Sequence, residues 1–550
     1  MLSYRKLAMR VLGRPLHTGG WGIDSPRPAS QRAAAFILTA AMLTTLAAPA
    51  FAATWRIEDG DITVKAGETE GTNKVSQGTN KDVVDTDTII TNSDKDTASS
   101  HTVTIDAGND KVEVTLKDVN IKADSGSALT SKGDVTLTLK GDNHLTGGNG
   151  DIYGGSGISS SGSLTISGGE TDSLTAQGGS GGDGIYGGDG ITSSGSLTIS
   201  GGTVTATGGN STGSDGSGGS GIYSVSGDVT ISGGSTVTAK GGDGGNFGGG
   251  SGIYSVGRVA ISGGTVTANG GDGGNVSGGG IISGNGGVTI SGGTVKAAGG
   301  DSKDGYGGDG IRSGGGVTIS GNTVNAAGGN GGKVGGYGIC SFDRVAISGG
   351  AVTANGGGGG SGIYSSDIDL SGSLELTAKA GSPNGKALSR AGYELDLDAI
   401  KDKLGPGAKV TATDADGKVN QVSIPGPVEP EKPVIPEESS SSSDGGSATP
   451  SAPASPLPGL TVTDKSGQRI SYTSTQSGNT LTVCVGRFTA SLRASLSALR
   501  QLRAEGIETI TFQTVLCSTT LSVDELLAMG GEDAEAVLTH RLTDSSLTVG

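Results

Sequence analysis

A recurring Gly-Ile pair constrains the fold of this chain more than any other sequence feature. Each pair precedes a short phrase similar to Val-Thr-Ile-Ser-Gly-Gly, and successive isoleucines are 33, 31, 31, 28, 30, 28 and 24 residues apart. These isoleucines are Ile158, Ile191, Ile222, Ile253, Ile281, Ile311, Ile339 and Ile363. A period of this length is typical of stacked repeats, and the uneven spacing indicates that insertions fall in loops between fixed phrases.

Each repeat contains three short phrases in which apolar and polar residues alternate, followed by a glycine-rich segment. This alternation predicts strands with one buried face. In one repeat we expect the inward side chains to be Ile253, Val259, Ile261, Val266 and Ala268. A single coil cannot bury its apolar side alone, but stacked coils can. The pattern therefore predicts an all-β fold, a right-handed parallel β-helix of about ten three-strand coils over residues 102–424.

Composition supports a thin core that is repeated many times. Glycine accounts for 108 of the 550 residues, and aromatic residues for only 3%, so large side chains cannot fill a conventional core along the whole chain. No proline occurs between Pro49 and Pro383. Central strands exclude proline because it has no amide hydrogen to donate, so this gap agrees with a long run of paired strands.

The regions outside the repeats predict an exported protein with a second domain. Residues 1–52 combine basic residues, an apolar run and the small-residue site Ala50-Phe51-Ala52, which predicts a signal peptide cleaved after Ala52 and a secreted or cell-surface location. We expect a β-rich cap at 53–101, a Pro/Ser-rich linker at 425–458 and a small α+β domain at 459–550. In that domain we expect strands at 481–485 and 509–515, and helices at 490–504 and 523–529.

Charge and cysteine content exclude several classes of function. Without residues 1–52 the chain keeps 32 basic and 53 acidic residues, a net charge of −21, which argues against nucleic acid and anionic membranes as partners. The sequence also predicts no integral membrane segment in the mature chain. Its three cysteines lack the spacing of a zinc site, and a Cys484–Cys517 disulfide is left open. The mature histidines are scattered, which argues against histidine-based catalysis.

Several phrases resemble those of a known family. The segments KVEVTLKDVNI (111–121) and GDNHLTGG (141–148), together with the serial SGI, SSGSLTISGG and LTAQGG units, are similar to those of the clostridial carbohydrate-binding domain-containing β-helix proteins. The resemblance covers the repeat region only. It implies an extracellular protein that binds a polysaccharide, either an acidic plant polymer such as polygalacturonate or a cellulose-like chain, with calcium associated with the fold. It transfers no individual binding residue.

One candidate metal site follows from the coil spacing. Asp243, Asp272 and Asp301 occupy equivalent positions after an Ala-x-Gly-Gly corner, so the β-helix would place them about 4.8 Å apart. Neighbouring carboxylates at this distance repel each other by about 1 kcal/mol in water and more in a lower dielectric. Calcium between them would relieve that repulsion. The alternative is that these loops splay into water, where the charges are screened.

A second column supplies candidate ligand-binding residues. The residue after each Gly-Ile pair should point outward, and at this position the chain has Tyr223, Tyr254 and Tyr364. Tyr223 and Tyr254 fall in adjacent coils, which predicts a flat aromatic strip of the kind on which a sugar ring can rest. The alternative is that tyrosine is used here only as a good strand former on an exposed face.

These observations predict a non-catalytic polysaccharide-binding protein, with calcium as a possible ion and no catalytic residue assigned. Two alternatives stay open. One is a polysaccharide lyase of the pectate-lyase-like type, although the arginines that could act as its base, Arg258, Arg312 and Arg344, are isolated among serine and threonine. The other is a surface adhesin or structural rod, which the sequence does not separate from a glycan binder.

Overall fold

The computed structural model describes residues 53–182, 186–211 and 213–426, and residues 460–549 with gaps at 465–466, 471, 478, 486, 488, 515–517, 530–534 and 542–543. The chain divides into two compact units, Met1–Gly426 and Pro427–Gly550. The expected signal peptide and its cleavage site lie outside the described residues, as do residues 427–458 of the expected linker.

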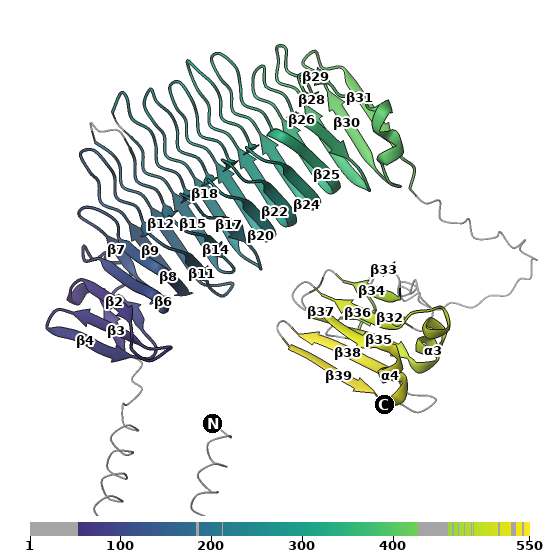
Figure 1. The fold of residues 1–550 in the computed structure, drawn as a ribbon, viewed down its shortest axis with the longest axis horizontal. Helices are drawn as coiled ribbons and strands as arrows, with labels where there is room; N and C mark the ends of the chain where they lie inside the picture. The colour runs from purple at the N-terminus through teal and green to yellow at the C-terminus, as the bar shows by residue number, and fades with distance from the viewer. Residues whose placement is uncertain are drawn as a thin grey trace, which may run out of the picture. The chain divides into compact units, whose positions relative to one another are not determined.

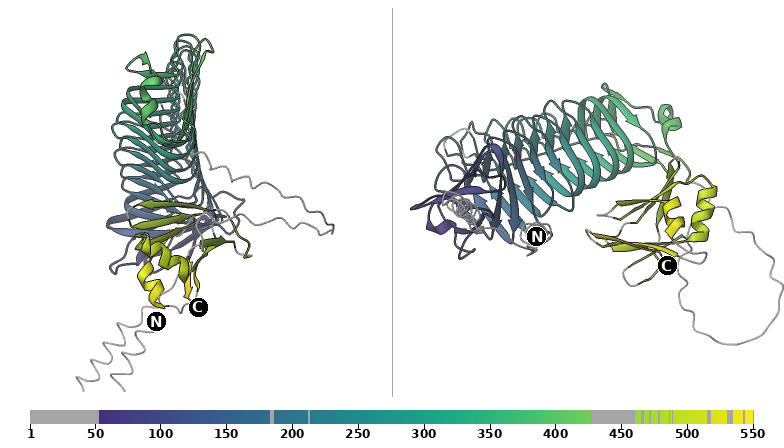
Figure 2. Two further views of the ribbon diagram at one scale, coloured as in Figure 1. Left: turned by 90° about the vertical axis from the view of Figure 1, so that its right-hand side faces the viewer. Right: turned by 60° about the horizontal axis from the view of Figure 1, so that its bottom comes forward.

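The first unit is a parallel β-solenoid of about 13 turns (Figures 1 and 2), which confirms the predicted parallel β-helix. Successive turns pair in parallel along three columns of strands. In the first column Ile222 pairs with Ile191 on one side and with Ile253 on the other. The solenoid has more turns than the ten expected, because turns near the N-terminus join the same column without carrying a Gly-Ile pair. Ile62 and Val103 are examples.

The strands that open each turn form the first column, and some continue into the next columns. They are β6 (Val103–Lys117), β8 (Leu129–Lys140), β10 (Ile158–Ser160), β13 (Ile191–Ser193), β16 (Ile222–Ser224), β19 (Ile253–Ser255), β21 (Ile281–Ser283), β23 (Ile311–Ser313), β25 (Ile339–Asn355), β26 (Ile363–Leu370) and β28 (Leu388–Arg390). The second column adds β11 (Leu164–Ser167), β14 (Leu197–Ile199), β17 (Val229–Ile231), β20 (Val259–Asn269), β22 (Val288–Ala298) and β24 (Val317–Ala327). The third column adds β7 (Asn120–Lys122), β9 (Asp142–Thr146), β12 (Ser173–Gln177), β15 (Thr203–Thr207), β18 (Thr236–Lys240), β27 (Leu374–Lys379) and β30 (Lys409–Thr413).

The core of the solenoid is a continuous stack of small and medium apolar side chains. All five residues predicted to point inward in one repeat, from Ile253 to Ala268, are at most 1% exposed. Full burial of an isoleucine or valine contributes about 1.5–3 kcal/mol. A stack of serines accompanies them, since from Ser193 to Ser365 the third residue of each first-column strand is a buried serine whose hydroxyl donates to a carbonyl of the preceding turn. For example, Ser255 Oγ donates to the Gly227 carbonyl at 2.9 Å, and Ser283 Oγ donates to the Gly257 carbonyl at 2.7 Å.

The described residues of the glycine-rich segments form a second stacked layer, which we call the blade. In each turn an outgoing leg leaves the third column and a return leg leads back to the first, and the legs of successive turns lie side by side. Gly181 bridges to Ser211 in the outgoing leg and Tyr186 to Ser217 in the return leg. The expectation that these segments splay into water is therefore wrong.

Backbone hydrogen bonds hold the blade together. Gly188 donates to Gly179 of its own turn at 2.9 Å, Gly209 of the next turn donates to Gly188 at 2.7 Å, and Gly219 donates to Gly209 at 2.9 Å. The same alternation between the two legs continues along the unit to Gly381. Only glycine fits these positions, because a Cβ atom on Gly219 would lie 2.0 Å from the Gly188 carbonyl oxygen.

Antiparallel strands close both ends of the solenoid and so cover the strand edges on which further coils could add. The N-terminal cap comprises β1 (Thr54–Arg56), a 3₁₀ turn η1 (Ile57–Asp59), β2 (Ile62–Ala66), β3 (Asn73–Gln77), β4 (Asn80–Asp85) and β5 (Ile89–Thr91). Within it the buried Trp55 indole donates to Asp85 Oδ2 at 2.8 Å. At the other end lie β29 (Tyr393–Glu394), η2 (Asp398–Lys403) and β31 (Val419–Ser423), and β30 and β31 form an antiparallel hairpin.

The second unit contains two four-stranded sheets and two helices. Its elements are β32 (Leu460–Thr463), β33 (Thr473–Ser477), β34 (Thr480–Cys484), β35 (Thr489–Ser495), α3 (Leu496–Ala504), β36 (Thr509–Gln513), β37 (Ser518–Ser522), α4 (Val523–Met529), β38 (Glu535–Arg541) and β39 (Asp544–Val549). The predicted helix at 490–504 is wrong in its first part. Residues 489–495 form β35, because this segment pairs with β32 and β38 and buries Ala490, Leu492 and Ala494 against them.

Candidate functional site

The surface that best fits a binding role is the outward face of the first column, which we call the strip. Its residues follow the Gly-Ile pairs in order and pair in register from turn to turn. They are Thr192, Tyr223, Tyr254, Ile282, Arg312, Cys340 and Tyr364. Each return leg of the blade ends two residues before the isoleucine of a Gly-Ile pair. The side chain at the end of the return leg therefore borders the strip.

Tyr223 and Tyr254 lie side by side, as predicted, but they do not form a flat platform. Their ring centroids are 5.3 Å apart and the rings meet edge to face, with 76° between their planes. Both side chains are half-buried. Burial raises the pKa of the Tyr223 hydroxyl, with smaller contributions from Tyr254 and Asp189, so the hydroxyl is neutral and available as a hydrogen-bond donor.

Tyr364, the third ligand-binding candidate, belongs to a separate cluster. It lies four turns beyond Tyr254, about 19 Å along the axis at strand spacing, and its ring stacks on Tyr337 with centroids 4.9 Å apart. Cys340 occupies the strip position one turn before Tyr364 and is 2% exposed, although this position predicts an outward side chain. Burial raises the pKa of the Cys340 thiol to about 12, so the thiol is protonated and unreactive.

Two carboxyl groups border the strip, and the sequence interpretation missed both. Asp189 and Asp309 occupy the position two residues before the isoleucine of their Gly-Ile pairs. Asp189 Oδ1 accepts the Ser220 amide at 2.7 Å, and burial raises the pKa of Asp189 to about 6. Asp309 Oδ1 accepts the Tyr337 amide at 2.7 Å, and burial raises its pKa. Comparing this position across the repeats would have found them.

Arg312 is the only cationic residue of the strip, and its charge is already balanced. Its Nη1 lies 3.9 Å from Asp309 Oδ2, and its guanidinium lies 5.1 Å from the centroid of the Phe342 ring. The other arginines considered as a lyase base are also paired. Arg258 lies 3.4 Å from Asp228, and Arg344 lies 3.1 Å from Asp367.

The three candidate metal ligands line up on the blade, and each has a backbone partner. Asp243 Oδ1 accepts the amide of Asp272 at 3.0 Å, Asp272 Oδ1 accepts the amide of Asp301 at 2.8 Å, and Asp301 Oδ1 accepts the amide of Asn330 at 2.6 Å. Upstream, Asn210 Oδ1 accepts the amide of Asp243 at 2.9 Å. The carboxylates are exposed, and each uses one oxygen to accept the amide of the next turn.

Groups of three or more histidine, cysteine, aspartate or glutamate side chains able to hold a metal ion are absent from the described part of the chain. Calcium on the aspartate row therefore stays a prediction. Cys484 is unbonded, while its proposed disulfide partner Cys517 lies outside the described residues. None of the described helices is long and apolar enough to cross a bilayer.

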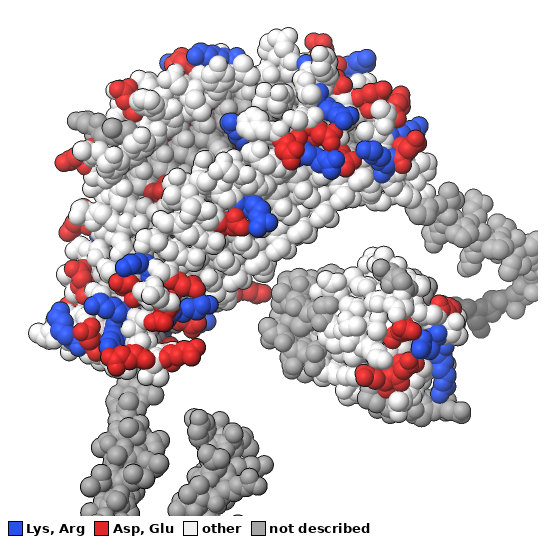
Figure 3. Space-filling model, in the orientation of Figure 1, with Lys and Arg blue, Asp and Glu red and all other residues white. Residues whose placement is uncertain are grey.

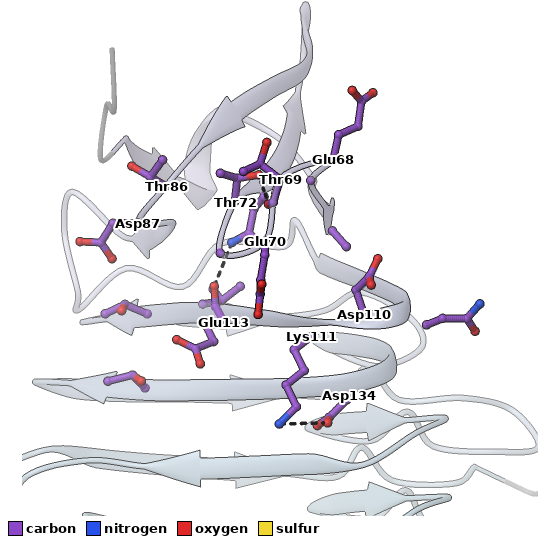
Figure 4. A pocket seen from close by; sticks show the side chains of 18 residues that line it. Glu68, Thr69, Glu70, Thr72, Thr86, Asp87, Asp110, Lys111, Glu113 and Asp134 are labelled. Atoms are coloured by element: carbon purple, nitrogen blue, oxygen red, sulfur yellow. Dashed lines mark hydrogen bonds and ion pairs between the residues drawn. The ribbon is translucent and has the colours of Figure 1, made fainter. Parts of the chain in front are cut away.

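A cleft of about 800 Å³ lies beside the N-terminal cap (Figure 4). Six acidic residues and a single lysine are its charged lining, and none of the lining residues is aromatic. Lys111 lies 3.6 Å from Asp134, and Lys74, outside the lining, lies 2.8 Å from Glu68. This acidic cleft without aromatic side chains is a poor place for a sugar ring or for a polyanion.

On one face of the first unit, charged side chains are unevenly distributed. Figure 3 shows them gathered over the two ends of the first unit, with few on the coils between. The coils between the two ends consist largely of serine, threonine and glycine, and the charged groups at the strip itself are Asp189, Asp309 and Arg312.

Comparison with known proteins adds no relative. The chain matches no protein-family model, and neither a curated protein nor a solved structure matches it at a significant level. The fold and the surfaces described above therefore carry the functional inference, and the family resemblance stays an expectation.

Proposed function

We propose that this chain is an exported, non-catalytic protein, secreted or held at the cell surface, that binds an extended polysaccharide along the strip. The observation that carries the proposal is the Tyr223–Tyr254 pair, two half-buried aromatic side chains at coil spacing on an otherwise weakly charged face. Tyrosine combines an apolar ring with a polar tip, which suits a ligand whose rings have apolar faces and hydroxyl edges. Export is supported by the basic and apolar character of residues 1–52.

Charge favours a neutral, cellulose-like chain over an acidic polymer. The strip has one cation, Arg312, which Asp309 already pairs, and two bordering carboxyl groups. The mature chain has a net charge of −21, so a polygalacturonate chain would be repelled unless a cation such as calcium bridged the two. We therefore expect stronger binding to cellulose-like chains, with polygalacturonate binding dependent on calcium.

Binding of the mature protein to soluble cellulose derivatives and to polygalacturonate, by affinity electrophoresis and calorimetry, tests the proposal. We expect Tyr223→Ala and Tyr254→Ala each to weaken cellulose binding by about two- to tenfold, the loss of one aromatic contact worth roughly 0.5–1.5 kcal/mol. Tyr393→Ala is the matched control, because Tyr393 is 79% exposed on the C-terminal cap, where its strand pairs with β28 five turns beyond Tyr254.

Equal binding by both strip variants and the wild type would contradict this site. Incubation of the mature protein with polygalacturonate and calcium tests the lyase alternative. Sustained release of unsaturated product from polygalacturonate with calcium, abolished by Arg312→Ala, would overturn the non-catalytic assignment, because it would require a proton-abstracting base.

A further inference from the structure

A row of exposed apolar side chains runs along the outer end of the blade, and we call it the tip ridge. Its members are between 39% and 64% exposed. They are Tyr153, Tyr186, Phe247, Val276, Tyr306 and Val334. Successive tips are in register: Tyr153 bridges to Tyr186 and Tyr186 to Ser217, while Val276 bridges to Tyr306 and Tyr306 to Val334. Phe247 adjoins the equivalent position of its own turn, Gly248, which bridges to Ser217.

The tip residues stay exposed because the blade offers nothing to pack against. The adjoining parts of both legs are glycine, and their backbones bond directly to one another. Two of the tips stack on each other, since the rings of Tyr153 and Tyr186 lie parallel with their centroids 5.7 Å apart. The tip ridge holds four of the eleven aromatic residues between Ala53 and Gly426. Such concentration of exposed apolar side chains marks an interaction surface.

Charges change sign along this ridge. Asp151 and Asp215 flank its first turns, whereas Lys333 flanks its last turn, with its Nζ 5.6 Å from the Tyr306 ring centroid. Lys303 and Asp304 flank the turn before and cancel each other. All five side chains are exposed, and none forms an ion pair with another described residue.

We propose that the tip ridge binds the tip ridge of a second copy of this chain, with the two solenoids antiparallel. The ridge spans seven turns from that of Tyr153 to that of Val334, and Phe247 belongs to the central turn. A two-fold axis through the Phe247 turn sets the first turn of one copy against the last turn of the other. Asp151 then faces Lys333 of the other copy, and the tyrosine-rich end faces Tyr306 and Val334.

Two features favour a second copy as the occupant. An identical ridge has the same coil spacing, so the contacts stay in phase over the whole length of about 29 Å. The antiparallel arrangement also brings opposite charges together, whereas a parallel one would oppose Asp151 to Asp151 and Lys333 to Lys333. A contact one side chain wide belongs to the small, reversible class of interfaces. We therefore expect a dimer whose population rises with protein concentration.

Sedimentation equilibrium of the mature protein over a wide concentration range, at physiological ionic strength, tests this proposal. We expect a monomer–dimer equilibrium that Phe247→Ser weakens at least tenfold, since it removes the side chain nearest the axis. Lys333→Asp and Asp151→Lys should each weaken the dimer, and the combined variant should restore it, because the reversed pair faces itself again across the axis. Lys296→Asp, an exposed lysine on β22 away from the tips, is the control for a charge reversal elsewhere.

A monomer at every concentration, or a combined variant no better than either single reversal, would overturn the proposal. Circular dichroism and melting of each variant show whether it remains folded. If the tip variants lose polysaccharide binding while the protein stays monomeric, the ridge binds glycan and the dimer is wrong. Tyr223→Ala should leave the dimer unchanged, so this proposal and the polysaccharide proposal fail independently.

Discussion

The body of the solenoid and its blade stack with the same coil spacing but by different means. In the body, the side chains of Ile253, Val266 and their equivalents are buried in the core, and the strands that carry them pair from turn to turn. In the blade, Gly188, Gly209 and Gly219 have no side chains to bury, and the stack consists of hydrogen bonds between backbones that nearly touch. One repeat unit thus contains an ordinary apolar core and a layer held mainly by hydrogen bonds between main-chain groups.

This difference predicts opposite tolerances to substitution. An apolar core accepts other apolar side chains of similar volume. The glycine positions at which the two legs of the blade meet accept none, because the spacing there is set by backbone atoms in contact rather than by side chains that can repack. It also explains the high glycine content, which in an ordinary chain would suggest disorder.

Gly219→Ala should produce the largest effect. Its Cβ would lie 2.0 Å from the Gly188 carbonyl oxygen and 2.5 Å from the carbonyl carbon. The turn that contains Gly219 would have to separate from the turn that contains Gly188, breaking the bond from Gly209 to Gly188. We expect a loss of about 3 kcal/mol or more in local stability, measured by hydrogen exchange of blade amides and by thermal melting.

Gly234→Ala is the matched control for that change. Gly234 lies in an exposed turn of the body, where an added Cβ meets no atom within 4 Å. It should leave melting unchanged or raise it slightly, because alanine has less freedom in the unfolded chain. Similar melting temperatures for the two variants would show that the blade yields to side chains and that the comparison is wrong.

The body could be predicted from the sequence, whereas most of the blade could not. The Gly-Ile alignment reveals the register of the first column, and with it the pairing of Tyr223 with Tyr254. Inward side chains follow from period-two alternation. The blade has no such alternation. The stacking of the blade depends on hydrogen bonds between its outgoing and return legs. A glycine-rich sequence has no periodic pattern that predicts these bonds.

The remaining errors of the sequence interpretation share a cause, because in each case the structure depends on residues that are neighbours in space and not in sequence. Leu492, Leu496 and Leu499 are spaced as on one face of a helix, yet Ala490, Leu492 and Ala494 also alternate as in a strand. Pairing with β38 selects the strand before residue 496. The row of Asp243, Asp272 and Asp301 was found, but its backbone donors were not, because they depend on the stacking of blade legs.

The second prediction concerns Asp189, which lies where the return leg of the blade meets the body. Burial raises its pKa from 3.8 to about 6, so the folded protein holds the proton on this carboxyl to higher pH than the unfolded chain does. The contribution of this protonated carboxyl to the free energy of unfolding is fully present below pH 3.8 and is lost as pH rises through about 6. Asp189→Asn should abolish this dependence and stabilise the protein by up to about 2 kcal/mol at pH 8, allowing for partial solvent screening.

Thermal melting between pH 4 and pH 8 measures that effect, with Asp416→Asn at an exposed position as the control. The asparagine can still accept the Ser220 amide through Oδ1, so the hydrogen bond that fixes the leg is retained. A variant that loses stability at pH 8 would mean that the charged carboxylate holds the junction together.

The smallest effect is expected from changing Asp243, Asp272 and Asp301 together to asparagine. Asn210 and Asn330 already form steps of the same row through their side-chain oxygens, so the ladder should persist and only the repulsion between neighbours, about 1 kcal/mol per pair in water, should disappear. If calcium binds the free carboxylate oxygens, it should raise the melting temperature of the wild type through binding to the folded state, and the triple variant should lose that response. Calorimetric titration of both proteins measures it. A calcium response of equal size in both would exclude the row as the site, because exposed carboxylates partnered by backbone amides would then be serving the stacking of the blade alone.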